Sequence, residues 1–215
     1  MRLYYKNDQD YISVTSVLNL KEPFSEEDQA RYEKWCKDNG YDPLLISVTS
    51  RILGTKVSTW IEDSLYELRF MDPLAVDKLE KKLKEGVDDF LDRWTLLRVE
   101  ETVFNSKLNY AGRFDGICKD KDGNKWLMDW KTFGAWRPEP YKRDTKKLKK
   151  AGDQLTLYKE AMDWDGKLGV VVFKNDGTYD IEERKPNPKI IQWVEDNQDL
   201  ILETIKDEKA KRAVS

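Results

Sequence analysis

Apolar positions over the first 95 residues recur mainly with a helical period. Val57, Ile61 and Leu65 follow one another at every fourth residue, which predicts one buried face of a helix. Ser25 with Asp28 three residues later is a capping pattern that predicts a helix start. The elements predicted for this part are, in order, a short strand or arm at residues 1–12, a helix start or buried turn at Ser13 to Asn19, and helices at Ser25 to Asp38, Leu44 to Leu68 and Leu74 to Trp94.

Short runs rich in β-branched and aromatic residues dominate from Leu97 onward, and turn residues separate them, as is typical of strands. Five strands are predicted: Leu97 to Asn105, Ala111 to Lys119, Lys125 to Thr132, Lys167 to Lys174 and Tyr179 to Arg184. The remaining predictions are a helix at Ala151 to Asp163, a long helix at Asn187 to Lys211, and a loop or lid at residues 133–150. This order predicts an α/β fold, with helices packed on a mixed sheet.

The turn between the second and third strands determines which residues face each other. Residues 120–124 contain an Asp-Gly pair, which is a strong hairpin signal. If Lys119 and Lys125 close the loop, Asp115 and Asp129 lie opposite each other, with Cβ atoms about 4.5–5.5 Å apart. Because strand side chains alternate, Lys131 shares the face of Asp129. A register slip of one residue would place Asp115 on the other face.

Two carboxylates this close favour a bound cation, because like charges repel and raise the pKa of one of them. Oxygen ligands suit Mg²⁺ or Mn²⁺, and such an ion would polarise a phosphodiester and activate a bound water. Lys131 would stabilise the hydroxide or the charge that develops on phosphorus. Asp115, Asp129 and Lys131 therefore form the centre of a candidate nuclease site. The alternative is a surface hairpin with ordinary charges, since 37% of the residues are charged.

Further motifs, in order along the chain, make it resemble the PD-(D/E)xK nuclease superfamily, in its RecB-like branch. The four that carry the resemblance are Glu100 to Phe104, Gly112 to Asp115, Asp129 to Lys131, and the Gln-x-x-x-Tyr stretch Gln154 to Tyr158. Ser13 to Leu18 is similar to the Ser-Val-Thr opening of mitochondrial genome maintenance exonucleases and related phage proteins. The resemblance spans about residues 10 to 160 and implies a restriction-endonuclease-like core.

The resemblance also implies roles for individual residues. Asp115, Asp129 and the backbone carbonyl of Trp130 would hold Mg²⁺ or Mn²⁺, whereas the Trp130 side chain alternates away from them into the core. Glu100 would be a third carboxylate of the site. Strand alternation lets only one of Glu100 and Glu101 point inward, and the motif favours Glu100; the alternative is a solvent-facing charge.

Gln154 and Tyr158 lie one turn apart on one helix face, where they would contact the phosphate backbone or position the metal-bound water. The alternative is a buried tyrosine with an amide neighbour. Relatives usually carry a histidine where this chain has Ser58, followed four residues later by Glu, here Glu62. A serine hydroxyl is a weak ligand, so three outcomes stay open: intact activity, activity that is weaker or prefers Mn²⁺, and a degenerate site. Activity is favoured, because Asp115, Asp129 and Lys131 are all present.

A dense basic run precedes the Gln154 helix and is expected to contact the nucleic-acid backbone, because lysines neutralise phosphates. Its members are Lys142, Arg143, Lys146, Lys147, Lys149 and Lys150. Trp136 and Arg137 would add stacking and guanidinium contacts to unpaired bases. A solvated charged surface is the alternative.

Composition limits the remaining classes. With 215 residues, eight Trp and ten Tyr, the chain is expected to fold as a single domain. The resemblance implies that this is a nuclease domain, with a mainly helical part at 1–95, a catalytic β core at 96–185 and a C-terminal helix at 186–215. The net charge of −3 gives no overall nucleic-acid signal. Two cysteines fit a reducing, intracellular compartment and are too few for a four-cysteine iron–sulfur cluster. Neither a signal peptide nor an apolar run long enough for a membrane span is evident.

The leading expectation is a metal-dependent DNA exonuclease that acts on single strands or DNA ends in replication, recombination or repair. Small relatives of this kind often come from phages or mobile elements. Two alternatives stay open: an endonuclease of the same superfamily, and a catalytically weak nucleic-acid-binding subunit with a helicase or recombination partner. The serine at position 58 is the main argument for the last of these.

Overall fold

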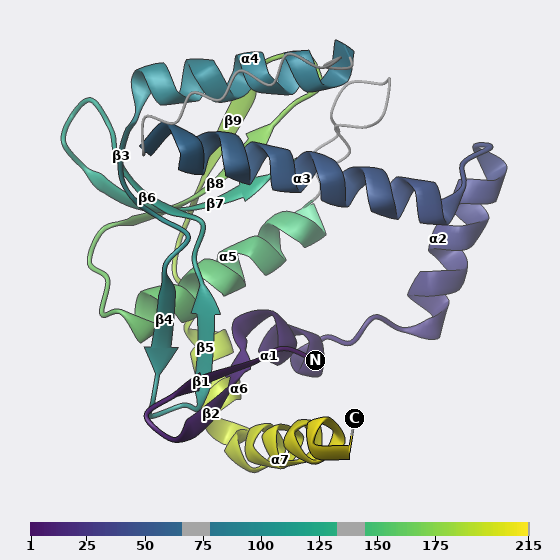
Figure 1. Cartoon of the computed structure of the whole chain (residues 1–215), viewed down its shortest axis with the longest axis vertical. Helices are drawn as coiled ribbons and strands as arrows, with labels where there is room; N and C mark the ends of the chain where they lie inside the picture. Colours follow the sequence, from purple (N-terminus) through teal and green to yellow (C-terminus); the bar gives the residue numbers. More distant parts are fainter. Residues whose placement is uncertain (66–77, 133–144, 215) are drawn as a thin grey trace.

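The computed structural model describes residues 1–65, 78–132 and 145–214 (Figure 1). Its helices are α1 (Val14–Lys21), α2 (Glu26–Asp38), α3 (Pro43–Leu65), α4 (Lys78–Arg93), α5 (Thr145–Ala161), α6 (Pro188–Asp196) and α7 (Gln198–Val214). Its strands are β1 (Leu3–Lys6), β2 (Gln9–Ser13), β3 (Thr95–Val99), β4 (Thr102–Asn105), β5 (Tyr110–Arg113), β6 (Gly116–Lys119), β7 (Lys125–Lys131), β8 (Lys167–Phe173) and β9 (Tyr179–Arg184). The fold is α/β, as the order of elements predicts.

The strands form two mixed sheets. The larger has the order β3-β6-β7-β8-β9, in which only β7 and β8 run parallel. The smaller has the order β1-β2-β5-β4, in which β2 and β5 run parallel and the other pairs are antiparallel. The chain first passes from the smaller to the larger sheet between β2 and β3, and then passes directly between the sheets from β3 to β4 and from β5 to β6.

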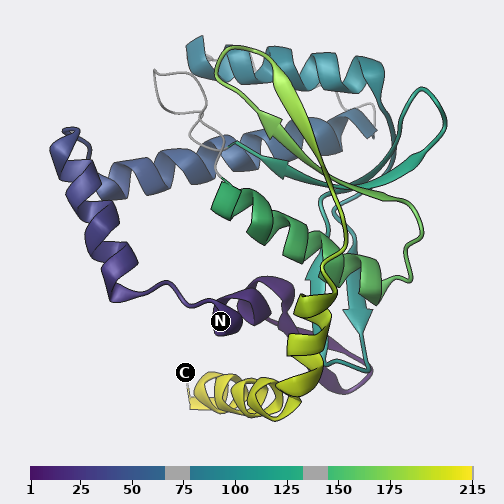
Figure 2. The same ribbon diagram turned by 180° about the vertical axis from the view of Figure 1, so that it is seen from behind.

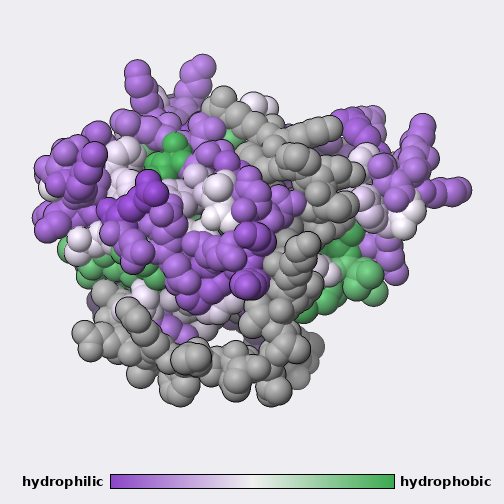
Figure 3. All heavy atoms as spheres, turned by 90° about the horizontal axis from the view of Figure 1, so that it is seen from above, coloured by the Kyte–Doolittle hydropathy of each residue, from purple (hydrophilic) through white to green (hydrophobic). Residues whose placement is uncertain are grey.

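Helices cover both faces of the larger sheet (Figures 1 and 2). On one face, Leu127 and Val170 share a core with Leu155 of α5. On the other face, Met128 and Val171 share a core with apolar residues of α3 and α4. The outer surface over α4 is mainly hydrophilic when seen from above, as its charged positions predict (Figure 3). Among the described helices, none has the length and hydropathy to cross a bilayer.

The predicted N-terminal helices are confirmed where the structure describes them. The side chain of Ser25 accepts a hydrogen bond from the backbone N–H of Asp28 and caps α2, and Gly40 follows that helix with a φ of 69°. Ser13 caps α1 in the same way. The predicted end of the third helix and the start of the fourth lie outside the described residues. The N-terminal segment forms the hairpin β1–β2 rather than a single strand or an arm.

Two predicted helix boundaries are wrong. α5 begins at Thr145 and not at Ala151, because the lysine-rich segment contains no helix breaker after residue 144 and lysine is a good helix former. The predicted C-terminal helix is two helices, α6 and α7, which meet at Asn197. The Asn197 side chain donates to the carbonyl oxygen of Trp193 at 2.7 Å, so it satisfies the end of α6 and lets the chain turn.

Candidate active site

Two predicted strands are each broken in the structure, and a candidate carboxylate lies at each break. The segment Leu97 to Asn105 divides at Glu100, which has a φ of 51°. The segment Ala111 to Lys119 divides at Phe114 and Asp115. The N–H of Glu100 donates to the carbonyl oxygen of Asp115 at 3.0 Å, so the two breaks are joined. The chain leaves one sheet for the other at this point, and the crossing brings both carboxylates together.

The predicted hairpin register is confirmed. Lys119 pairs with Lys125, and the ladder continues to Gly116 opposite Met128. Asp115 lies one step beyond the last pair, where its Oδ2 accepts a hydrogen bond of 2.7 Å from the backbone N–H of Trp130. The Asp115 carboxylate is therefore fixed beside the end of β7, near Asp129.

Asp129 is buried on the α5 side of β7, with 1% of its side chain exposed. Its Oδ2 forms an ion pair with the ammonium of Lys131, two residues along the same face. Among the described residues, neither carboxylate oxygen of Asp129 accepts a hydrogen bond of regular geometry. A buried carboxylate without such bonds is costly, so this position favours a bound cation.

The electrostatics of the cluster follow from burial and from the like charges. Burial raises the pKa of Asp129 to about 7, with Asp115 adding to the rise and Lys131 opposing it. Burial also raises the pKa of Asp115, against the opposing charge of Lys131. For Lys131, burial works to lower the pKa, but the two carboxylates outweigh it and raise the pKa. Asp115 and Asp129 are therefore harder to ionise than free carboxylates, and a bound divalent cation would favour their ionised forms.

Glu100 points inward, as the motif indicates, whereas Glu101 is more exposed and pairs with Arg98. The reason is the break in the strand and not strand alternation. Glu100 pairs with Arg113 at 2.7 Å between Oε2 and Nε. Burial and the charge of Asp115 raise the pKa of Glu100, and Arg113 opposes that rise. The Glu100 carboxyl thus belongs to the same electrostatic cluster as Asp115.

The Gln-x-x-x-Tyr residues of α5 hold the Gly-x-x-Asp segment in place. The Tyr158 hydroxyl donates to the carbonyl oxygen of Arg113 at 3.0 Å and accepts from the Gln154 amide at 3.0 Å. A methyl group at Gly112 would lie 2.6 Å from the Tyr158 ring, so only glycine allows this approach. Tyr158 is 3% exposed. It therefore acts on the site by positioning the strand that leads to Asp115, and Gln154 orients its hydroxyl.

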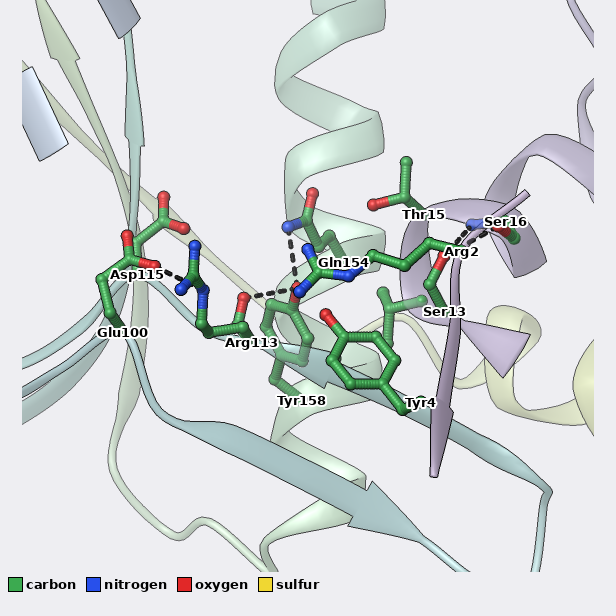
Figure 4. Close-up of a pocket in the computed structure, with 12 residues that line it drawn as sticks. Arg2, Tyr4, Ser13, Thr15, Ser16, Glu100, Arg113, Asp115, Gln154 and Tyr158 are labelled. Atoms are coloured by element: carbon green, nitrogen blue, oxygen red, sulfur yellow. Dashed lines mark hydrogen bonds and ion pairs between the residues drawn. The ribbon is translucent and has the colours of Figure 1, made fainter. Parts of the chain in front are cut away.

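A cavity of about 460 Å³ opens beside Asp115 (Figure 4). Glu100, Asp115, Gln154 and Tyr158 line it together with two motif segments, Ser13 to Ser16 and Gly112 to Arg113. Arg2 and Tyr4 also line it, and no motif indicated them. The N-terminal hairpin enters the site through the parallel pairing of β2 with β5, about one hundred residues away in sequence. Local patterns do not report such long-range pairing. The Arg113 side chain could have been found from its place inside the Gly-x-x-Asp motif.

Helix α3 carries the two remaining candidates, Ser58 and Glu62. Glu62 is half-buried, and its charge contributes to the raised pKa of Glu100. Ser58 is half-buried one turn earlier. Within the described ranges, no three His, Cys, Asp or Glu side chains converge closely enough to hold one metal ion. The pair Asp115 and Asp129 with a backbone carbonyl remains the candidate ligand set.

The predicted basic run is only partly described. Arg137, Lys142 and Arg143 lie outside the described residues, as does Trp136. The lysines that follow are on the first turns of α5 and contact other elements. Lys146 lies 3.7 Å from Asp28, Lys149 lies 3.1 Å from Glu22, and Lys150 donates to Asn19 at 2.8 Å; Lys147 is exposed. These contacts join α5 to α1 and α2, and nucleic-acid contact by these lysines stays a prediction.

Comparisons with known proteins add little. No family model matches the chain. No curated protein matches it either. Among the solved structures that match is the crystal structure of SSO0001, with 17% sequence identity and a TM-score of 0.40; the match covers 92% of this chain and 78% of that chain.

Proposed function

We propose that the protein is a metal-dependent deoxyribonuclease that hydrolyses phosphodiester bonds. The observation that carries the proposal is the buried cluster of Asp115, Asp129 and Lys131, of which Asp115 lines a cavity. The Asp129 carboxylate lies within the protein without regular hydrogen bonds, and a hard divalent cation would compensate it. A structural ion pair would not need a second carboxylate close by, since that carboxylate adds repulsion.

Each residue has a role that follows from its place. Asp115, Asp129 and the carbonyl of Trp130 would hold Mg²⁺ or Mn²⁺, which when bound supplies positive charge to the phosphodiester and lowers the pKa of water. The Lys131 ammonium, held beside Asp129, stabilises negative charge that develops at the reacting phosphate. Glu100 can accept a proton because its pKa is raised. Tyr158 and Gln154 keep the Asp115 segment in position.

The cavity supports the exonuclease form of the proposal. Its volume of about 460 Å³ is in the range that holds one small ligand, which suits a single strand or a DNA end better than a long duplex. Action in replication, recombination or repair, beside a helicase or recombination partner, fits such a substrate. An endonuclease with the same residues is the alternative form.

The experiment is degradation of end-labelled single-stranded and double-stranded DNA in Mg²⁺, Mn²⁺ or EDTA. Lys131→Ala is expected to reduce cleavage by about 10²–10³-fold and to leave folding and DNA binding intact. Lys125→Ala is the matched control, because Lys125 is the exposed first residue of the same strand. Cleavage is expected to need the metal, and the product ladder distinguishes exonuclease from endonuclease action.

An Asp129→Ala variant that cuts at the full rate would overturn the proposal. So would cleavage that continues unchanged in EDTA. Loss of activity in Lys125→Ala as well as in Lys131→Ala would indicate that charge on the strand, and not the cluster, matters.

The serine at position 58 favours a second candidate function, a nucleic-acid-binding subunit with weak catalysis. If Ser58 faces the metal position, Ser58→His should raise metal affinity and cleavage, because imidazole is a far better ligand than a hydroxyl. Thr59→His, on the neighbouring exposed position, is the control. The second candidate would be favoured if the unmodified protein binds DNA in a salt-sensitive way but does not cut it, and if Ser58→His does cut it.

A further inference from the structure

One end of the cavity is formed by a side chain with no part in the carboxylate cluster. Arg2, just before β1, points into the cavity toward Tyr158 and Gln154 (Figure 4). Its guanidinium carbon lies 4.6 Å from the centre of the Tyr4 ring, so the two side chains stack. Within the described residues, Arg2 forms no ion pair with a carboxylate of this chain. A stacked arginine of this kind is ordered before any ligand arrives, and its hydrogen-bond donors remain available.

Several contacts fix the backbone that carries Arg2. Its carbonyl oxygen accepts a hydrogen bond of 3.2 Å from the N–H of Ser13. The C-terminal helix α7 also holds this hairpin. Lys209 pairs with Asp10 at 2.9 Å, and Arg212 donates to the carbonyl oxygen of Met1 at 3.0 Å. The position of Arg2 is therefore determined by elements from both ends of the chain.

A second guanidinium lies on the other side of Tyr158. Arg113 pairs with Glu100 through Nε, and about half of its side chain is exposed. The Tyr158 hydroxyl, which accepts from Gln154 and donates to the Arg113 carbonyl, stands between the two arginines (Figure 4). The cavity thus has carboxylates at one end and guanidinium groups at its middle and far end.

We infer that Arg2 and Arg113 form a phosphate-binding subsite, which holds a phosphate group of the substrate strand next to the phosphodiester at Asp115. Guanidinium groups bind phosphate oxygens through paired, charge-assisted hydrogen bonds, and carboxylates repel them. The cavity can hold about one nucleotide unit between the two ends. The inference rests on the proposed function and names its substrate class: a strand with at least one phosphate beyond the one that is cut.

The test is binding and cleavage of single-stranded oligonucleotides by Arg2→Met and Arg2→Lys. Methionine keeps an unbranched side chain against Tyr4 and removes the charge. We expect Arg2→Met to weaken binding about tenfold or more, because hydrogen bonds to a charged group are stronger than those between neutral groups. The slope of log K against log salt should fall by about 0.7, the value for one phosphate on a single strand. Arg2→Lys should restore the salt slope but only part of the affinity.

Arg93→Met is the matched control, because Arg93 is an exposed arginine at the end of α4 that pairs with its own helix. It should bind and cut as the unmodified protein does. Binding is measured in the Lys131→Ala background with Mg²⁺, so that cleavage does not consume the oligonucleotide.

The phosphate could be internal or terminal, and modified oligonucleotides distinguish the two. One series carries a single uncharged methylphosphonate at successive linkages, and another carries a 5′-phosphate, a 3′-phosphate or only hydroxyl ends. The modification that removes the phosphate bound by Arg2 should weaken oligonucleotide binding by the unmodified protein about tenfold. It should leave binding by Arg2→Met unchanged, because the partner of the phosphate is already gone; the two changes together form a double-mutant cycle.

The outcomes separate this inference from the proposed function. If the protein cuts DNA and Arg2→Met behaves like Arg93→Met, the subsite is wrong and the nuclease proposal stands. If no DNA is cut but Arg2→Met still weakens binding in a phosphate-specific way, the subsite stands and the nuclease proposal is wrong. Equal weakening at every modified linkage would also overturn the subsite.

Discussion

The two faces of strand β7 are built from alternate residues of one strand, yet they are chemically opposite. Trp126, Met128 and Trp130 point to the side of α3 and α4, into a core rich in aromatic rings. Asp129 and Lys131 point to the side of α5, into a buried ionic cluster. The two faces differ because one stabilises the fold and the other carries the candidate chemistry.

Phe90 of α4 shows what the aromatic face contributes. Its ring centre lies 5.4 Å from Trp130, 5.8 Å from Phe173 and 5.4 Å from Tyr179, all with edge-to-face geometry. Such pairs are favourable beyond the apolar area they bury. Asp129 has no comparable set of partners. The stability that the aromatic packing provides therefore offsets the free-energy cost of the buried charges on the other face of the same strand.

The largest effect is expected on the aromatic face. Phe90→Ala should lower the free energy of unfolding by about 3–5 kcal/mol, because it removes a fully buried ring and leaves a cavity. Urea denaturation measures this change. Phe24→Ala is the control, since Phe24 is 67% exposed and should change stability by less than about 0.5 kcal/mol. A small effect for Phe90→Ala would mean that the core can collapse around the loss.

Asp129→Asn should have the opposite effect on stability and a severe effect on function. It removes a buried charge that lacks regular hydrogen bonds, so the metal-free protein at pH 8 should gain about 1–3 kcal/mol. Cleavage should be lost in the same variant. Urea denaturation and the cleavage assay are run on one preparation. If Asp129→Asn instead loses as much stability as Phe90→Ala, the ion pair with Lys131 is a structural element and the two faces do not differ.

Gly112→Ala tests whether the position of Tyr158 is part of the site. The added methyl group would lie 2.6 Å from the Tyr158 ring, so stability should fall by about 1–3 kcal/mol. Cleavage per folded molecule should also fall, because the Arg113 carbonyl would lose its tie to Tyr158. Gly54→Ala is the matched control: a Cβ there meets its nearest neighbour, the Thr132 side chain, at an ordinary 3.8 Å, and alanine favours the helix. Normal cleavage by Gly112→Ala would show that Tyr158 is only a core residue.

Particular residues show how far the sequence predicts this arrangement. The hairpin register is local, because the Asp-Gly turn sets it, and the structure confirms the predicted pairing of Lys119 with Lys125. Continuous strands were predicted through Glu100 and Asp115, where the chain in fact changes sheets. Residue patterns report a strand but not the sheet it joins, because that choice depends on distant partners. Arg2 was missed for the same reason.

The smallest effect is a dependence of stability on pH that belongs to the ionic face. Burial raises the pKa of Asp129 to about 7, whereas an unfolded Asp titrates near 4. The folded protein therefore binds a proton that the unfolded chain has already released, and stability must fall as pH rises through 7. With half a proton difference at pH 7, the slope is about 0.7 kcal/mol per pH unit. Asp115 and Glu100 act in the same direction, because their pKa values are also raised.

Thermal unfolding between pH 6 and 8, without metal and with saturating Mg²⁺, measures this slope. Asp129→Asn should flatten it in the absence of metal, and Phe90→Ala should lower every value but keep the slope. Mg²⁺ should also flatten it, because a cation at the carboxylates removes the advantage of the bound proton, and its stabilising effect should be larger at pH 8 than at pH 6. A slope that neither Asp129→Asn nor Mg²⁺ changes would place the titrating groups elsewhere. The ionic face of β7 would then not be destabilised by the Asp129 charge, because neither removal of that charge nor a bound metal would change the pH dependence of stability.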